Sequence, residues 1–180
     1  KVLLIIATAA AFALPTCATD SFFAELSGGY LFANDAAFKE VYGEGGFLPE
    51  VRLQFDVGPS FFLSSGAGFL SKKGLAPRLL KEAESRQIFL SLGGGYDARL
   101  SDKLHLRFGP ALLLASYREE VAGETQSGTR LGWRLDVDLL YSLGGAWRTG
   151  ITAGYASASD TVEDVSFKMG GFRIGAAVGI

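Results

Sequence analysis

The most regular feature of the chain is an alternation of apolar residues with small or polar ones, which begins at Phe22 and continues to Ile180. Around Trp133, one set of alternate positions is Leu131, Trp133, Leu135, Val137, Leu139 and Tyr141, and the other is Gly132, Arg134, Asp136, Asp138 and Ser142. Successive side chains of a β-strand point to opposite faces, so this pattern predicts a strand with one apolar and one polar face.

Similar stretches recur along the rest of the chain. Strands are predicted over 46–57, 86–99, 103–117, 131–142 and 171–180, and the less regular stretches 22–32, 60–70 and 145–156 are compatible with strands. These make eight strands, each close to the roughly 9 to 11 residues with which a tilted strand crosses a bilayer.

The connections between these strands alternate in length. Short connections fall at 58–59, 100–102 and 144–145, and longer polar ones fall at 33–45, 71–85, 118–127 and 157–164. Tight turns at one end and long loops at the other are typical of up-and-down barrels. The predicted fold is therefore all-β, an eight-stranded antiparallel up-and-down transmembrane β-barrel with its short turns and both termini on the periplasmic side.

The polar set of positions fits the inside of such a barrel better than the apolar set. An eight-stranded barrel has room inside only for packed side chains, and the polar set is rich in Gly, Ala and Ser. The chain has 24 Gly among 180 residues, roughly twice the usual share. Columns of Leu, Phe and Trp would then face lipid. The alternative is a soluble barrel or sandwich with those columns inside.

Charges on the inward set predict a polar network in the lumen. Its expected members are Glu25, Glu50, Arg52, Asp56, Asp97, Arg99, His105, Arg107, Arg134, Asp136, Asp138, Arg148 and Arg173. Opposite charges are nearly balanced, as burial requires, because an unpaired charge in a dry interior costs several kcal/mol. Every cation among the paired charges is Arg, whose planar fork matches a carboxylate. We therefore expect a salt-bridged plug and no open pore.

Aromatic residues on the apolar set lie towards the strand ends. Near the short turns they are Phe55, Phe61, Tyr96, Tyr141 and Trp147, and near the long loops they are Phe32, Phe47, Phe69, Trp133, Tyr155 and Phe172. Two such belts mark the two membrane interfaces.

The first 18 residues predict a secretory signal peptide, followed by a barrel domain over 19–180. Lys1 precedes an apolar run over 2–14, and small residues follow at the expected cleavage site. The run is too short to span a bilayer as a helix. An alternative is a lipoprotein, with lipid attached to Cys17.

With these features the sequence resembles the small outer-membrane β-barrel family, which includes OmpX-like, OmpA-like and OmpW-like barrels. The segment 38–43, FKEVYG, is similar to one common in porin-family barrels. The apolar positions of the last strand resemble the C-terminal signal read by the barrel-assembly machinery, although Ile180 stands where an aromatic residue is usual. The resemblance implies outer-membrane lipid, lipopolysaccharide and that machinery as partners, in a bacterial outer membrane.

The sequence offers little for catalysis. His105 is the only His, and its predicted place beside a short turn favours a role in the lumenal network over a catalytic one. Ser91 and Ser116 do not lie in a nucleophile-elbow sequence. The Gly93-Gly94-Gly95 run lies inside a strand, so it does not indicate a phosphate loop. We therefore predict no catalytic, cofactor or metal site, and the net charge of −2 gives no basic footprint for nucleic acid.

The segment 71–86, SKKGLAPRLLKEAESR, is the most basic predicted loop. A short helix is expected after Pro77, with Arg78 and Glu82 paired one turn apart. Its candidate surface contacts are Lys72, Lys73, Arg78, Lys81 and Arg86. These cations would contact lipopolysaccharide phosphates or a partner at the cell surface, and the simpler interpretation is a solvated loop that joins two strands.

Three functional hypotheses follow. The first is a monomeric, non-enzymatic barrel with a plugged lumen and a structural or surface-interaction role. The second, implied by the OmpW-like branch, is passage of small hydrophobic solutes, which needs an apolar outer lumen and a lateral opening. Inward Leu31, Leu48, Leu70 and Leu113 are compatible with it. The third is a lipid A-modifying enzyme, which the position of His105 disfavours.

Overall fold

The computed structural model of the chain describes residues 22–77, 81–162 and 165–180. The expected signal peptide over 1–18, with Cys17, lies outside the described residues. The elements are β1 (Phe22–Ala33), α2 (Ala36–Tyr42), β2 (Gly45–Asp56), β3 (Phe61–Ala76), β4 (Lys81–Arg99), β5 (Leu104–Val121), β6 (Glu124–Gly144), β7 (Trp147–Val162) and β8 (Val165–Gly179).

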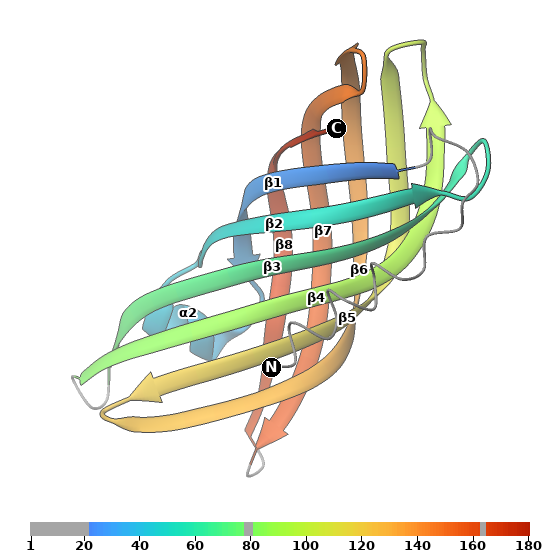
Figure 1. Ribbon diagram of the computed structural model, residues 1–180. Coiled ribbons are helices and arrows are strands. Elements are labelled where there is room, and N and C mark those ends of the chain that lie inside the picture. The colour runs from blue at the N-terminus through green and yellow to red at the C-terminus, as the bar shows by residue number, and fades with distance from the viewer. Residues whose placement is uncertain (1–21, 78–80, 163–164) are drawn as a thin grey trace.

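The eight strands form one closed barrel in which each strand pairs with its neighbours in the sequence (Figure 1). Every pairing is antiparallel, including that of β1 with β8. Two backbone hydrogen bonds between Ala24 and Ile180, of 2.8 and 2.9 Å, extend this last pairing. The predicted eight-stranded antiparallel up-and-down barrel is confirmed, although β2 pairs with β3 only over residues 50–56 and 62–68.

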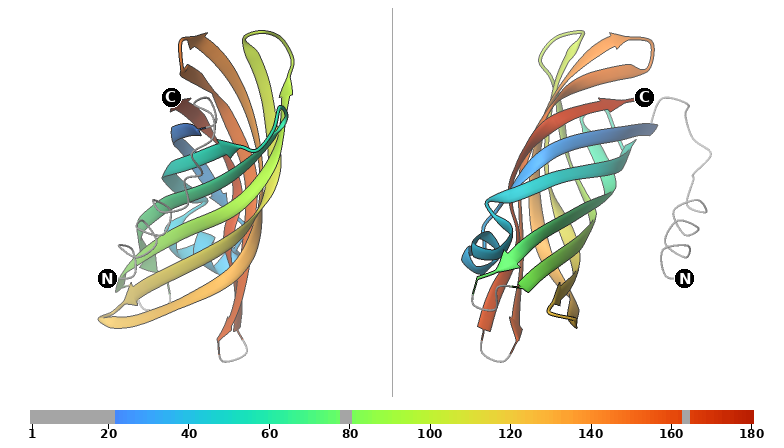
Figure 2. Two further views of the ribbon diagram at one scale, coloured as in Figure 1. Left: turned by 45° about the vertical axis from the view of Figure 1, so that its right-hand side comes forward. Right: turned by 90° about the vertical axis from the view of Figure 1, so that its left-hand side faces the viewer.

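The predicted short turns are present at one end of the barrel, where β1 begins and β8 ends (Figures 1 and 2). The long-loop end differs from the prediction. Strands β3 and β4 pair as far as Ala76 and Lys81, and β5 and β6 pair as far as Val121 and Glu124. Most of 71–85, 118–127 and 157–164 is therefore strand, which supplies backbone partners that a loop would have to find in water.

The helix predicted after Pro77 is wrong for the described residues, because the chain from Lys81 onward is strand. Arg78 lies outside the described residues. The segment 33–45, expected to be a loop, instead contains the helix α2. Its N-cap is Asp35, whose Oδ1 accepts a hydrogen bond of 2.8 Å from the Phe38 amide. An aspartate in this place satisfies an amide that has no partner within the helix.

The outer surface of the barrel is apolar and its interior is partly charged. Among the most exposed large apolar side chains are Leu131 at 75% and Leu112 at 68%, whereas Arg107 inside is 0% exposed. This distribution is the reverse of that in a water-soluble domain, and it is what a lipid solvent requires. Among the described residues, the only helix, α2, is too short to cross a membrane.

Candidate functional site

The lumen has three levels, and the one nearest the short turns is organised around Arg107. Its Nε lies 2.8 Å from Oδ2 of Asp97, and another guanidinium nitrogen donates to the side-chain oxygen of Gln54. The rings of Phe23 and Phe62 lie 5.1 and 5.5 Å from the guanidinium carbon. Carboxylate, amide and two aromatic faces thus surround a fully buried cation, each by an interaction that favours its charge.

A small residue makes this packing fit. A Cβ atom at Gly95 would lie 2.8 Å from the Phe62 ring and 2.2 Å from the Phe108 carbonyl oxygen. Only glycine therefore leaves room for Phe62 to reach Arg107. The glycines of the inward set serve the narrow lumen in this way.

The middle level contains two linked groups of charges. Arg52 lies 2.8 Å from Glu25 and 2.6 Å from Asp138, and these three side chains come from β2, β1 and β6. Arg52 and Glu25 face each other directly in the β1–β2 register. All three are at most 4% exposed, so the pairs are shielded from water and weakly screened.

The second group joins Glu50 to Arg134 and Arg173. Glu50 lies 2.8 Å from Arg134 and also pairs with Arg173. Asp136 pairs with the same two cations, at 2.6 and 3.2 Å. Thr152 accepts a hydrogen bond of 3.0 Å from Arg173 and one of 3.5 Å from Arg52, which connects the two groups.

The structure brings most of the predicted network together, with two exceptions. Arg99 is exposed at the end of β4, at the rim where water reaches the barrel. Arg148 has no ion pair among the described residues, and its guanidinium lies 5.1 Å from the Phe23 ring instead. Asp56 is marginal, with its carboxylate 3.9 Å from Arg107 and 35% exposed.

Several uncharged residues of the lumen were not among the predicted members of the network, namely Phe23, Gln54, Phe62 and Thr152. Their positions within the strand alternation place them on the inward face together with the charged residues. Gln54, for example, lies two residues from Arg52 and is 0% exposed. The period-two signal could have identified them, because it does not depend on charge.

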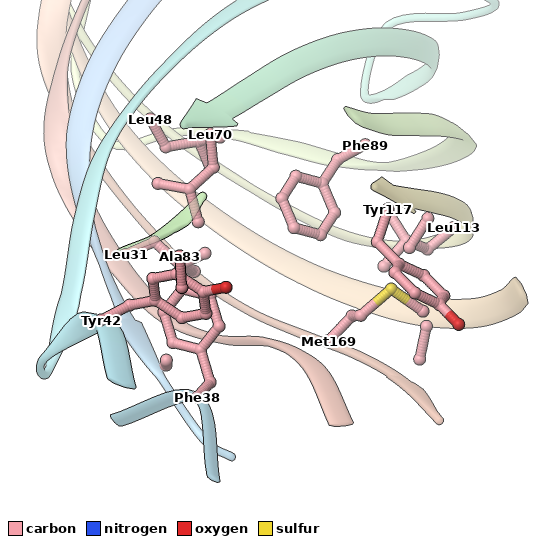
Figure 3. Close-up of a cluster of buried hydrophobic side chains, with 13 residues drawn as sticks. Leu31, Phe38, Tyr42, Leu48, Leu70, Ala83, Phe89, Leu113, Tyr117 and Met169 are labelled. Carbon is pink, nitrogen blue, oxygen red and sulfur yellow. The ribbon is translucent and has the colours of Figure 1, made fainter. Parts of the chain in front are cut away.

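The third level, towards the long loops, is apolar (Figure 3). Its buried cluster consists of Leu31, Ala33, Phe38, Tyr42, Leu48, Leu70, Ala83, Phe89, Leu113, Ala115, Tyr117, Ala158 and Met169. We call this set the outer cluster. It contains the four leucines that the hydrophobic-solute hypothesis needs. The lumen therefore changes from charged to apolar along its axis.

Helix α2 lies at the long-loop end, in contact with β1 and β3 (Figures 1 and 2). Phe38 and Tyr42 point from it into the outer cluster, with ring centroids 4.8 Å apart. Asp35 also fixes the start of α2 to β8, because its Oδ2 accepts a hydrogen bond of 2.8 Å from the Lys168 amide. One carboxylate thus caps the helix and holds it to the barrel wall.

The predicted surface cations do not share one face. Lys73 and Arg86 are exposed, and Arg86 faces Arg118 directly across the β4–β5 pairing. Lys72 is half-buried and Lys81 is exposed at the first residue of β4. Arg86 donates a hydrogen bond of 2.6 Å to Glu84, which holds the pKa of that carboxyl below its ordinary value.

His105, the single histidine of the chain, lies on the inward face of β5 and pairs with Asp97. Nδ1 of His105 lies 3.0 Å from Asp97, and no serine hydroxyl of the described chain contacts the imidazole. Asp97 is also paired with Arg107. Over the residues the structure describes, no three His, Cys, Asp or Glu side chains are grouped to hold a metal ion.

An apolar exterior and a closed barrel crossed by buried ion pairs together define an integral membrane β-barrel. The model of the family described as outer membrane protein beta-barrel domain matches residues 2–178, and the chain belongs to this family. A search of curated protein sequences finds no match.

Solved structures show the same fold at low sequence identity. OprG from Pseudomonas aeruginosa is 10% identical with a TM-score of 0.66, over 90% of this chain and 96% of that one. Neisserial surface protein A is 14% identical with a TM-score of 0.64, over 88% and 96%. Ail from Yersinia pestis, in complex with the heparin analogue sucrose octasulfate, is 9% identical with a TM-score of 0.57, over 90% and 100%.

Proposed function

We propose that the protein is a monomeric, non-enzymatic barrel of the bacterial outer membrane, with a closed lumen and a structural or surface-interaction role. The observation that carries this proposal is the middle level of paired charges. Glu25, Glu50 and Arg52 are 1%, 2% and 4% exposed, although they lie on the lumenal face. Side chains so well covered by one another leave little space for a file of water or ions.

Conductance across a planar lipid bilayer tests the closed lumen. The purified wild-type barrel, inserted and verified by its heat-dependent shift on a gel, should give no steady single-channel openings. The lumen could open only if several buried ion pairs of the middle level separated at once. Loss of one partner of such a pair strongly destabilises the folded barrel. Steady wild-type openings would show that the lumen conducts.

The surface role that we propose is contact with lipopolysaccharide phosphates through Arg86 and Arg118. These residues face each other on the outer surface, and Phe69 and Ile88 lie in the row next to them on the membrane side. Like charges directly across a strand pair are destabilising. Glu84 already pairs with Arg86, and a phosphate between the two guanidinium groups would add an anionic partner that both share. Ail, which has the same fold, was solved in complex with the polyanion sucrose octasulfate.

Titration with lipopolysaccharide tests this contact. Arg86→Ala with Arg118→Ala should weaken binding, and the effect should disappear when the lipopolysaccharide has been dephosphorylated. Lys103→Ala is the matched control, because it removes an exposed cation at the short-turn end. Equal affinities of the double variant and the control would overturn the proposal.

A second candidate function is passage of small hydrophobic solutes, which the apolar outer cluster favours. This function needs a lateral exit from the lumen. A cavity of about 20 Å³ lies beside β7 and β8, lined by Tyr155 and Gly170 among others, and it holds at most a single water-sized group. Uptake of a labelled alkane into cells with and without the protein tests this function. Faster uptake with the protein, and its loss in Leu113→Arg, would favour passage over a closed lumen.

The lipid A-modifying hypothesis is the weakest of the three, since His105 is occupied by Asp97 within the lumen. His105→Ala should leave the lipid A profile of the cell unchanged. Altered acylation of lipid A in cells with this variant would support the enzyme hypothesis.

A further inference from the structure

A pocket of about 410 Å³ lies between α2 and strands β4, β5 and β8, at the outer end of the lumen. Its apolar wall includes Phe38 and Tyr42 from the helix and Tyr117 and Met169 from the barrel. In Figure 3 the helix pair lies on one side and the barrel pair on the other. The pocket is therefore walled by three aromatic rings from two separate elements.

Glu119 is one of the two acidic residues that line this pocket, with Asp35. It follows Tyr117 on the lumenal face of β5, opposite Ser85 and Gln126 in the register. Burial and the nearby Asp35 raise the pKa of Glu119, with the Ser85 hydroxyl opposing that shift. No ion pair to Glu119 is present in the described part of the chain, and the carboxylate is only partly exposed.

A second polar group converges on the same place. Tyr42 is 6% exposed and its hydroxyl has no hydrogen-bond partner among the described residues. Figure 3 shows that oxygen pointing from the helix towards the interior of the barrel. Burial and the negative charge of Glu119 raise the pKa of Tyr42. A buried hydroxyl without a hydrogen-bond partner destabilises the folded state, and a bound ligand that supplied the partner would remove that cost.

We propose that this pocket binds a small organic cation, an amine carried on an apolar or aromatic body. Glu119 pairs with the ammonium group, and the hydroxyl of Tyr42 accepts one of its hydrogens. The rings of Phe38, Tyr42 and Tyr117 contact the body, and aromatic faces also attract a cation. This inference goes beyond the proposed function and does not depend on whether the lumen conducts.

The other charged groups around the pocket are compatible with this ligand. Asp35 adds a second negative charge, although both of its oxygens are already engaged by backbone amides. Lys168 is exposed and lies at the edge of the pocket. An anionic ligand would meet Glu119 and Asp35 inside the pocket, so the charge balance selects a cation.

The test uses the full barrel in lipid nanodiscs and three probes of equal size. These are phenethylamine, which is cationic at neutral pH, the neutral 2-phenylethanol, and the anionic phenylacetate, each measured by equilibrium dialysis. Phenethylamine should bind most tightly, and Glu119→Gln should weaken it by about tenfold, which corresponds to loss of one partly shielded charge pair. Tyr42→Phe should weaken it less, because the ring remains.

Glu120→Gln is the matched control, since Glu120 is the next residue of β5 but is exposed on the other face. It should leave binding unchanged. Acidification should weaken phenethylamine binding to the wild type as Glu119 is protonated, and should have little effect on binding to Glu119→Gln. The site is wrong if the alcohol binds as tightly as the amine, if Glu119→Gln binds like Glu120→Gln, or if no probe binds. None of these outcomes bears on conductance or on lipopolysaccharide binding.

Discussion

Arg52 shows how a charged side chain is made tolerable at the centre of this barrel. It pairs with Glu25 and Asp138 and is 4% exposed. The free-energy cost of removing its guanidinium from water is offset by two carboxylates and a threonine hydroxyl from three other strands. The same contacts tie those strands together, so the loss of Arg52 would leave buried carboxylates without a cation.

We predict that Arg52→Met lowers the free energy of unfolding by about 3 to 5 kcal/mol, because methionine fills a similar space but leaves Glu25 and Asp138 uncompensated. Unfolding in urea, followed by the heat-dependent gel shift, measures the change. Arg99→Met is the control, because Arg99 is exposed at the rim, and its effect should stay within about 0.5 kcal/mol. Equal effects would mean that the lumenal pairs do not stabilise the barrel.

At the scale of elements, α2 is the part that the sequence pattern concealed. The segment 33–45 contains no strand alternation, and its seven-residue helix is too short to show a clear helical period. Strand extension was missed for a different reason. Residues 81–87, KEAESRQ, favour helix by intrinsic propensity, but pairing with β3 and β5 decides their structure.

We expect Asp35→Ala to loosen α2 while the barrel stays folded. It removes the N-cap of the helix, an effect of about 1 kcal/mol, and it also removes the acceptor of the Lys168 amide. Hydrogen exchange should then accelerate at the amides of α2 and remain slow in β2 and β5. Asp35→Asn should have a smaller effect, because its side-chain oxygen can still cap the helix. Unchanged exchange in the alanine variant would contradict this role of Asp35.

At the scale of the whole molecule, the sequence predicted the barrel well because one physical rule governs nearly every strand. A narrow closed sheet needs small or paired polar side chains inside and bulky apolar ones outside. The alternation of positions along a strand therefore places Arg107 inside and Leu112 outside, as the structure has them. This alternation could not predict which charged side chains form ion pairs with one another. The β1–β2 register aligns Glu25 with Arg52, but the contact of Arg52 with Asp138 depends on closure of the barrel across its diameter.

The lipid-facing surface gives a further prediction. Val137 of β6 is 42% exposed, opposite Phe108 of β5 and Ala153 of β7, and lies midway between Trp133 and Tyr141 of the two predicted aromatic belts. Val137→Arg should destabilise the barrel in lipid vesicles by about 2 to 4 kcal/mol, whereas Thr125→Arg, at the far end of the same strand, should change stability by about 0 to 1 kcal/mol. Reversible urea titration measures both. Equal values would mean that β6 does not cross the bilayer at Val137.

The change from charged to apolar along the lumen has one further consequence. Under the proposed closed lumen, the outer half of the barrel is a blind-ended cup, with an apolar wall, a helix at its lip and a layer of fixed charge as its floor. A molecule that entered from outside would meet apolar side chains first and the charged middle level next. It could leave only through the outer end of the barrel. Such a cup suits capture and retention of a molecule rather than its delivery to the other side of the membrane.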